Sequence, residues 1–197
     1  ICAGAVRRKN VQNTTLKNLL DVCGGAIAFY TVGYSFSFGD HSEGGVTFIG
    51  SGNFFLLNMA EDETGVAYSY WLYQFAFAAT SATIVAGTLA ERCQMNAYLF
   101  YSMALTGFVY PVVAHSVWSN RGFLSKEIDK PLFGSGMIDF AGSGVVHVTG
   151  GFTALIATKL LGARKGRFYD ERGELLEEPK TFPGHSKSLQ MLGTFIL

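Results

Sequence analysis

The chain has 197 residues, of which 49% are hydrophobic and 15% charged, whereas about 25% of the residues in an average soluble domain are charged. Its net charge of zero gives no reason to expect a nucleic-acid partner. The three cysteines are far apart, which argues against a disulfide or metal framework. The chain lacks an initiator methionine and a signal peptide, and it ends inside an apolar run, so we expect an excerpt of a longer protein.

Long stretches without charged residues predict membrane-spanning helices. No Asp, Glu, Lys or Arg lies between Glu63 and Glu91 or between Arg92 and Arg121, and a bilayer core needs about 20 mostly apolar residues per helix. The predicted spans are residues 16–39, 68–90, 96–118 and 138–161, with a further span that begins near residue 188. Backbone polar groups in lipid must bond internally, so the predicted fold class is an all-α, polytopic transmembrane helix bundle.

The basic residues predict which loops lie outside the membrane. Twelve of the 15 Lys and Arg residues lie before or at the start of the first span, between the second and third spans, or at the end of the fourth span and after it, and three lie in the loop between the third and fourth spans. Because basic residues concentrate on the inner side, loops 40–67 and 119–137 are predicted to be extracellular. The first span then runs outward and the fourth runs inward.

Asp139 and His147 are ionisable residues of the fourth predicted span. At about 1.5 Å per helical residue, His147 lies roughly 12 Å deeper than Asp139 and therefore near the midplane. An ionisable group there usually faces a cavity or the bundle interior, and the alternative is a core histidine bonded to a neighbouring helix. Asp139 either caps free N–H groups at the helix start or stabilises a cation in an outer vestibule.

Aromatic side chains gather at the outer ends of the second and third spans. Trp118 ends the third span. The outer half of the second span contains Tyr70, Trp71, Tyr73, Phe75 and Phe77. Such residues usually form an interfacial belt, but ring faces also bind small cations. At the inner end of the second span, Glu91 and Arg92 are interpreted as a boundary charge pair that caps and anchors helices.

Five sequence blocks resemble, in the same order, blocks of the ammonium transporter and Rhesus family. Their sequences are most similar to those of the ammonium transporters of the plant and protist type. The blocks are residues 6–10 (VRRKN), 89–92 (LAER), 107–115 (GFVYPVVAH) followed by Trp118, 139–147 (DFAGSGVVH) and 162–168 (GARKGRF). The resemblance implies eleven helices in two inverted repeats plus one extra helix, assembled as a homotrimer in the plasma membrane. Residues 1–197 would be a partial ammonium transporter domain, from the end of helix 1 through the start of helix 6.

The resemblance also implies roles for four residues. Trp118 matches the aromatic residue of the outer ammonium site, and Phe77 matches the inner of two stacked phenylalanines that close the pore. Asp139 matches the acidic residue below that site, and His147 the first of two pore histidines. The implied mechanism recruits NH4+ at Trp118, removes a proton near Phe77 and Asp139, and passes NH3 through the hydrophobic pore past His147. The implied partners are ammonium or ammonia, methylammonium as an analogue, and the lipid bilayer.

Two alternatives accompany this hypothesis. An ammonium sensor or receptor on the same fold would share these residues. A membrane redox enzyme would need paired mid-span histidines as haem ligands, whereas His41 and His185 lie in loops and His115 lies at a span end. We therefore predict a transporter without a cofactor or metal, and not an enzyme, and we assign no role to His115.

Overall fold

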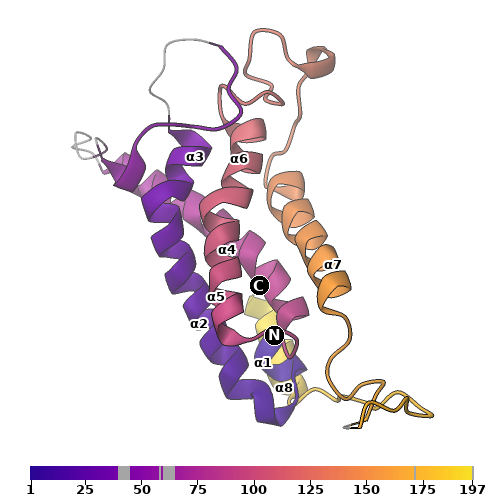
Figure 1. The fold of residues 1–197 in the computed structure, drawn as a ribbon. Coiled ribbons are helices and arrows are strands. Elements are labelled where there is room, and N and C mark those ends of the chain that lie inside the picture. The colour runs from indigo at the N-terminus through magenta and orange to yellow at the C-terminus, as the bar shows by residue number, and fades with distance from the viewer. Residues whose placement is uncertain (40–44, 58, 60–64, 171, 197) are drawn as a thin grey trace.

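The computed structural model describes residues 1–39, 45–57, 59, 65–170 and 172–196. Within these residues, every regular element is a helix, and the only β pairing consists of three isolated bridges. Four helical spans are long and apolar enough to cross a membrane, namely Arg8–Phe38, Val66–Leu89, Met95–Trp118 and Ser143–Leu161. They lie alongside one another as a bundle (Figure 1). The predicted all-α transmembrane bundle is confirmed.

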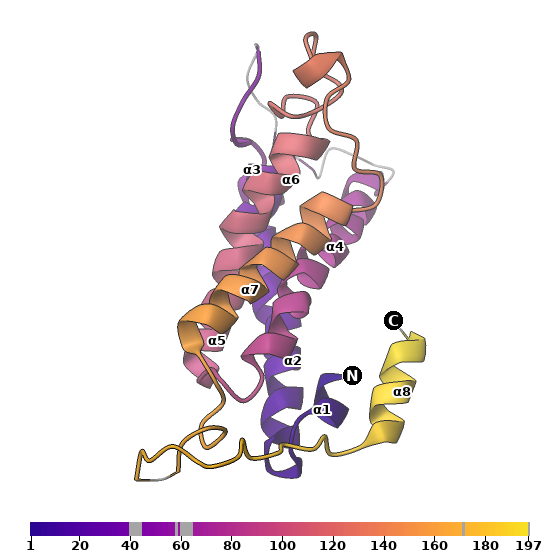
Figure 2. The same cartoon turned by 90° about the vertical axis from the view of Figure 1, so that its right-hand side faces the viewer.

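The first, third and fourth spans are each made of several helical segments, whereas the second span is one continuous α-helix. The first span comprises a 3₁₀ turn (Arg8–Asn10), α2 (Val11–Ala28), a π turn (Phe29–Gly33) and α3 (Tyr34–Phe38). The second is α4 (Val66–Leu89), and the third comprises α5 (Met95–Ala104), a π turn (Leu105–Val109) and α6 (Tyr110–Trp118). The fourth comprises a π turn (Ser143–Val148) and α7 (Thr149–Leu161). The short helices α1 (Cys2–Ala5) and α8 (Lys187–Ile196) pack together beside the start of α2 (Figure 2).

The predicted boundaries hold for two spans and fail for the other two. The second and third spans begin and end within two residues of the prediction. The first begins at Arg8, eight residues earlier than predicted, because the polar turns before residue 16 are also helical. The fourth begins at Ser143 and not at residue 138, because Gly142 has a positive φ of 89° that interrupts the helix. The predicted span near residue 188 corresponds to α8, of which ten residues are helical.

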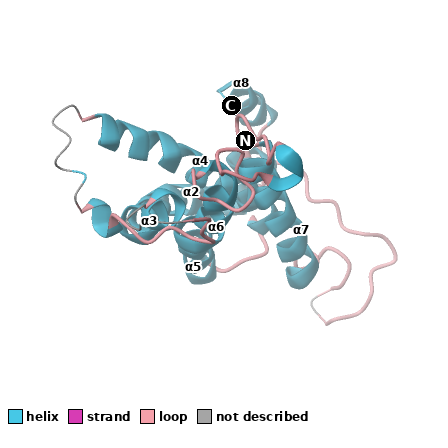
Figure 3. Cartoon of the chain, turned by 90° about the horizontal axis from the view of Figure 1, so that it is seen from above, coloured by secondary structure: helices cyan, strands magenta, loops and turns pink. Residues whose placement is uncertain are grey.

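Small residues allow α4 to approach its neighbours closely. Ala78, Ala82 and Ala86 follow one another at four-residue intervals and are all buried, so they form one stripe on the helix. A Cβ atom added to Gly150 of α7 would lie 2.8 Å from the backbone oxygen of Ser81. Helices in lipid associate through such close van der Waals contact. Seen from above, α7 lies at one side of the bundle (Figure 3).

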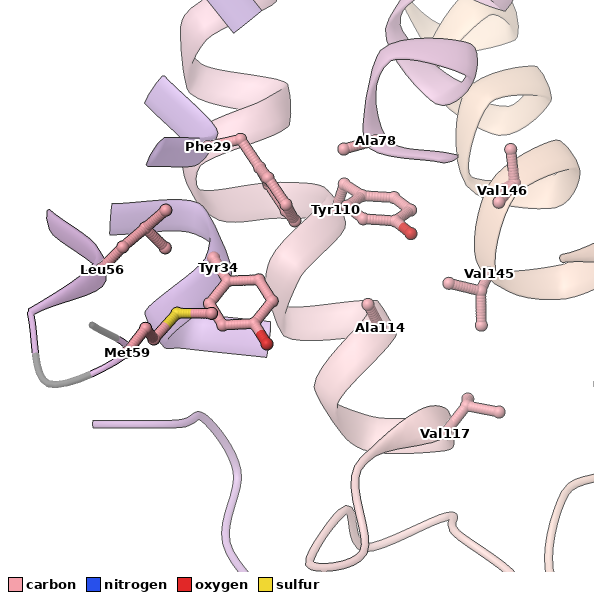
Figure 4. Close-up of a cluster of buried hydrophobic side chains, with 10 residues drawn as sticks. All are labelled: Phe29, Tyr34, Leu56, Met59, Ala78, Tyr110, Ala114, Val117, Val145 and Val146. Carbon is pink, nitrogen blue, oxygen red and sulfur yellow. The ribbon is translucent and has the colours of Figure 1, made fainter. Parts of the chain in front are cut away.

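A cluster of buried apolar side chains connects the four spans toward the end of the bundle that carries residues 45–57 and 119–137. Figure 4 shows Tyr110 of α6 lying between Phe29 of the first span and the Val145 and Val146 pair of the fourth. The rings of Phe29 and Tyr110 have centroids 6.5 Å apart, and both residues are fully buried. The cluster also contains Tyr34, Leu56, Met59, Ala78, Ala114 and Val117. This packing fixes the position of the ends of α4 and α6, where the candidate site lies.

The loops that are poor in Lys and Arg and the loops that are rich in them lie at opposite ends of the bundle, as predicted from the distribution of basic residues. Residues 45–57 and 119–137 lie at one end, here called the loop end, where the Thr47 N–H donates to the Arg121 backbone oxygen at 2.8 Å (Figure 1). Segment 6–10, turn 90–94 and segment 162–186 lie at the other end, here called the basic end. The extracellular placement of the loop end stays a prediction. Residues 40–44, 58 and 60–64 of the first predicted outer loop, His41 among them, lie outside the described residues.

At the basic end, Glu91 links three distant parts of the chain. Its fully buried carboxylate accepts hydrogen bonds from Arg7 Nε and Arg164 Nη1, both at 2.9 Å, and from the Asn10 amide. The predicted pairing of Glu91 with its neighbour Arg92 is therefore wrong. Arg92 instead donates to the backbone oxygens of Thr88 and Gly162, so its predicted capping role is confirmed.

Burial alone would raise the pKa of Glu91, but hydrogen bonds from Asn10 and Arg7 outweigh this effect and hold the pKa below its ordinary value. The carboxylate is therefore charged at neutral pH. Glu91 also has a left-handed backbone, with φ at 63°, a conformation that costs a non-glycine residue roughly 1–2 kcal/mol. The bonds to segment 6–10 and to Arg164 stabilise this strained turn.

Candidate functional site

A cavity of about 400 Å³ opens at the loop end between α4, the end of α6 and the segment before the fourth span. Three of the four predicted site residues, Phe77, Trp118 and Asp139, line it together. The cavity lining also includes Tyr70, Tyr73, Gln74, Val117, Ile138 and Phe140. The structure thus brings together Phe77 and Asp139, which are 62 positions apart in the chain.

An aromatic pair forms one wall of this cavity. The rings of Phe77 and Trp118 have centroids 5.5 Å apart and meet at 67°, in an edge-to-face arrangement. Tyr73 lies one helical turn before Phe77 on α4, and those two rings meet at 5.0 Å and 90°. Each contact is a favoured geometry for aromatic rings. Phe77 and Trp118 are half-buried, so parts of both rings stay available to a ligand.

Trp71 and Phe75 of α4 pack against the first span and do not line the cavity. Trp71 and Phe75 stack with centroids 5.9 Å apart and planes 9° apart. Their partners in the first span are Tyr30, 6.3 Å from Trp71, and Phe29, 6.2 Å from Phe75. Residues two positions apart on a helix point in different directions, which explains why positions 73 and 77 face the cavity while 71 and 75 face the bundle.

Asp139 caps the start of the fourth span. Its Oδ1 atom accepts the backbone N–H groups of Gly142 and Ser143 at 2.7 and 2.8 Å. Its Oδ2 atom accepts those of Gly144 and Val145 at 2.9 and 2.7 Å. The first N–H groups of a helix lack partners within the helix, and a carboxylate there also suits the helix dipole. The predicted capping role is confirmed.

The capping bonds also fix the charge of Asp139. Burial would raise the pKa of this carboxyl group, but hydrogen bonds from four backbone N–H groups outweigh burial and hold the pKa below its ordinary value. Asp139 is therefore a fixed negative charge at the cavity wall and a weak proton acceptor.

Asp139 also positions Trp118. The indole Nε1–H of Trp118 donates to the backbone oxygen of Asp139 at 2.7 Å. Gly142 packs closely beside the Trp118 ring. An added Cβ atom at Gly142 would be 2.5 Å from a methyl group of Val146 and 3.5 Å from that ring. A single turn thus caps a helix and orients the aromatic wall.

His147 lies outside the cavity lining, on the exposed surface of the fourth span. Its Nδ1 atom bonds the backbone oxygen of Gly142, five residues earlier, at 3.0 Å. The pore role of His147 and the alternative of a core histidine bonded to a neighbouring helix both stay predictions. In a neutral imidazole this bond makes Nδ1 the donor and leaves Nε2 as an acceptor. The predicted separation of roughly 12 Å from Asp139 is unfounded, because residues 139–142 are not helical.

His115 and Gln74 are two further buried polar residues near the loop end. His115 is buried and bonds the Ser37 backbone oxygen through Nδ1 at 2.9 Å and the Thr47 hydroxyl through Nε2 at 2.8 Å, which fastens the loop to the first span. Gln74 is a buried cavity-lining residue that sequence reasoning missed, and it donates to the Tyr70 hydroxyl at 2.9 Å. The signal in the sequence that could have identified Gln74 is that it is a single amide side chain within an apolar span.

Comparison with known proteins places the chain in a family. The model of the Ammonium Transporter Family matches residues 1–197. Ammonium transporter 1 member 2 of Arabidopsis thaliana is 48% identical over 200 aligned positions, which cover 100% of this chain and 37% of that protein. Ammonium transporter 3 of Dictyostelium discoideum is 42% identical and is covered over 41% of its length. These relatives agree with the predicted plant and protist resemblance.

The solved structure of a Sensor Amt Protein resembles the chain with a TM-score of 0.80 at 32% identity, covering 100% of this chain and 46% of that one. The chain therefore spans less than half the length of the proteins it resembles. The family match covers residues 1–197, and this multi-pass membrane chain therefore belongs to the ammonium transporter family.

Proposed function

We propose that the protein carries ammonium across the plasma membrane and that this chain supplies the entrance and part of the path. The observation that supports this proposal best is the cavity at the loop end, where Phe77, Trp118 and Asp139 converge. The names of the relatives and the match to the whole chain supply the substrate.

The cavity wall suits weak capture of a small cation. Ring faces attract a cation by about 0.5–2 kcal/mol, depending on how far it is desolvated. Trp118 and Phe77 offer such rings, and Asp139 adds a negative charge whose oxygens are already hydrogen-bonded. Because the carboxylate is occupied by four N–H groups, it attracts ammonium without enclosing it, so the ion is also released.

The proton must leave before the apolar part of the path, because an unpaired ion in an apolar medium carries a large desolvation penalty. The low pKa of Asp139 makes it a poor base, so we assign it the role of stabilising the cation and not that of accepting its proton. Water at the open mouth of the cavity would accept the proton that NH4+ gives up. NH3 then passes His147, whose Nε2 atom can accept a hydrogen bond from it.

The remaining features of the proposal concern the whole protein. The chain corresponds to the end of helix 1 through the start of helix 6, and the missing half would cover the exposed side of the fourth span that carries His147. Three copies would assemble in the bilayer, each with its own path. An ammonium sensor on the same fold is the second candidate, since one similar structure is titled a Sensor Amt Protein. Transport is preferred because both curated relatives compared above are named transporters.

The test is uptake of labelled methylammonium by cells that lack their own ammonium transporters and express the full-length protein. Wild type should accumulate the label, and Phe77→Leu combined with Trp118→Leu should reduce accumulation at low concentration. Phe133→Leu is the matched control, because Phe133 is 95% exposed and lies outside the cavity. A wild-type protein that reaches the membrane and accumulates no label would contradict transport and favour the sensor.

A further inference from the structure

A second cavity, of about 950 Å³, lies at the basic end and has no part in the proposed transport path. It is more than twice as large as the cavity beside Trp118. Its basic lining residues are Arg7, Lys9, Arg164, Lys165, Arg167 and Lys180. Asp170 is the acidic residue among the described lining. A smaller cavity of about 490 Å³ adjoins it and shares Arg164, Arg167 and Phe182.

The walls of this basic cavity are held in place by contacts that leave much of their charge available. The guanidinium of Arg7 lies 3.8 Å from the centroid of the Phe182 ring. Arg167 and Lys180 bond to each other's backbone, with Lys180 N–H donating to the Arg167 oxygen at 2.9 Å and Arg167 Nη1 donating back at 2.7 Å. The N–H of His185 donates to the Val6 oxygen, which ties segment 162–186 to the N-terminal wall.

The positive charge of the cavity is only partly compensated. Glu91 pairs with Arg7 and Arg164. In the described part of the chain, the other four basic lining residues form no ion pair within 4.0 Å. Asp170 is already an acceptor for the N–H groups of Arg172 and Glu174. Clustered cations on a concave surface concentrate the field and attract an anion with several acceptor oxygens, for which phosphate is the best match.

The surroundings of the cavity favour a lipid as the source of that phosphate. The fourth span ends at Leu161, directly before the cavity, and Leu160 there is 80% exposed. Phe168, which lines the cavity, and its neighbour Tyr169 are also exposed apolar side chains. A basic recess beside the exposed apolar end of a spanning helix fits a headgroup and its acyl chains, whereas a soluble phosphate would use the recess alone.

We propose that the cavity at the basic end binds the phosphate of an anionic phospholipid in the adjoining leaflet. Lys165 and Lys180 supply charge to the phosphate, and the exposed apolar residues at the end of α7 contact the acyl chains. The charge distribution predicts that this end faces the cell interior, where anionic lipids concentrate. This binding is independent of ammonium capture at the opposite end of the bundle.

Native mass spectrometry of the full-length protein with dioctanoyl phosphatidic acid tests the proposal. Wild type should bind this lipid more tightly than dioctanoyl phosphatidylcholine and more tightly than inorganic phosphate. Lys165→Gln with Lys180→Gln should weaken binding about fivefold for each lysine lost. Arg172→Gln with Lys187→Gln is the matched control, because it removes two exposed charges at the same end that do not line the cavity.

Four results would overturn the proposal. Equal binding of the two lipids would show that the net negative charge of the headgroup is not recognised. An equal loss in the control pair would reduce the effect to general surface charge. Inorganic phosphate that binds as tightly as phosphatidic acid would identify a soluble ligand, and a full-length protein that binds no phosphatidic acid would show that another part of the chain fills the cavity.

Discussion

The indole N–H of Trp118 donates to the backbone oxygen of Asp139, and the carboxylate of that same Asp139 accepts four successive N–H groups, from Gly142 to Val145, at the start of the fourth span. The aromatic wall and the helix cap are therefore one mechanical unit. A change at Asp139 is expected to move Trp118 as well as remove a charge. Experiments on either residue must separate its geometric effect from its effect on the cation.

Replacing Trp118 should weaken capture of the substrate more than it slows maximal uptake. Trp118→Leu removes both the ring face and the hydrogen bond to Asp139, whereas Trp118→Phe keeps a ring and loses the bond. A cation–π contact of about 1–2 kcal/mol predicts that half-saturation by methylammonium rises roughly tenfold in the leucine variant. The phenylalanine variant should show a smaller rise. If the leucine variant saturates like wild type, Trp118 is an interfacial belt residue.

Asp139→Asn should destabilise the protein because an amide keeps one acceptor oxygen where the carboxylate has two. The expected loss is about 1–3 kcal/mol, the range for hydrogen bonds to a charged group. Thermal unfolding in detergent measures it, with Asp129→Asn in the loop 119–137 as the control. The folded pKa is lowered, so this contribution is complete above the ordinary value of 3.8 and is lost as the pH falls below it. Equal unfolding temperatures for the two variants would contradict the capping role.

Glu91→Gln should separate the three segments that meet at the basic end. The variant loses the charge that binds Arg7 and Arg164, and the expected destabilisation is on the order of 2 kcal/mol. Glu127→Gln is the control, because the Glu127 and Lys126 side chains are 53% and 60% exposed and such pairs contribute about 0–1 kcal/mol. Because the pKa of Glu91 is lowered, its contribution is also lost as the pH falls below 4.5. A Glu91→Gln protein as stable as the control would show that the buried pairs contribute nothing net.

His147 should decide what passes and not only how fast. A carboxylate in His147→Asp can stabilise a cation within the membrane, where a charge otherwise costs several kcal/mol, so this variant should admit K+ or carry ammonium current. His147→Ala should lose the acceptor for NH3 and become less selective. Electrophysiology of the full-length protein with ammonium and then with K+ compares the variants with wild type. Identical currents in all three would leave His147 as a surface residue.

The predicted topology can be tested by labelling single cysteines in a background in which Cys2, Cys23 and Cys93 are replaced by serine. Ser51→Cys and Ser135→Cys, which are exposed at the loop end, should react with an impermeant thiol reagent applied outside. Thr181→Cys at the basic end should react only after the membrane is permeabilised. Reaction of the cysteine at position 181 from outside would reverse the orientation.

The sequence predicts the spans well because length and the absence of charge are local properties. It predicts the start of the fourth span poorly, because the interruption at Gly142 depends on a positive φ and on a carboxylate three residues earlier. Hydropathy does not register either feature. The estimate of roughly 12 Å between Asp139 and His147 rests on the same assumption of a continuous helix from Asp139, whereas residues 139–142 are not helical.

The ion pairs of the chain are even harder to predict from the sequence. Glu91 is adjacent to Arg92 in the sequence, yet its partners are 84 and 73 positions away. A long-range pair is set by how the spans fold back on one another, which a single sequence does not reveal. The aromatic site was easier, because Phe77 and Trp118 were identified through their sequence resemblance and then placed on one cavity by the fold.

The π turns in the first, third and fourth spans have a consequence for how the chain can change its length. A π turn contains one residue more than the α-helical turn it replaces. Deleting one residue within Phe29–Gly33 or Leu105–Val109 would leave an ordinary helix, and the segments on both sides would keep their contacts. Elsewhere in a span, the same deletion would rotate every following side chain by about 100° around the helix axis. The three turns are thus the places where a spanning helix can lose a residue without losing its register.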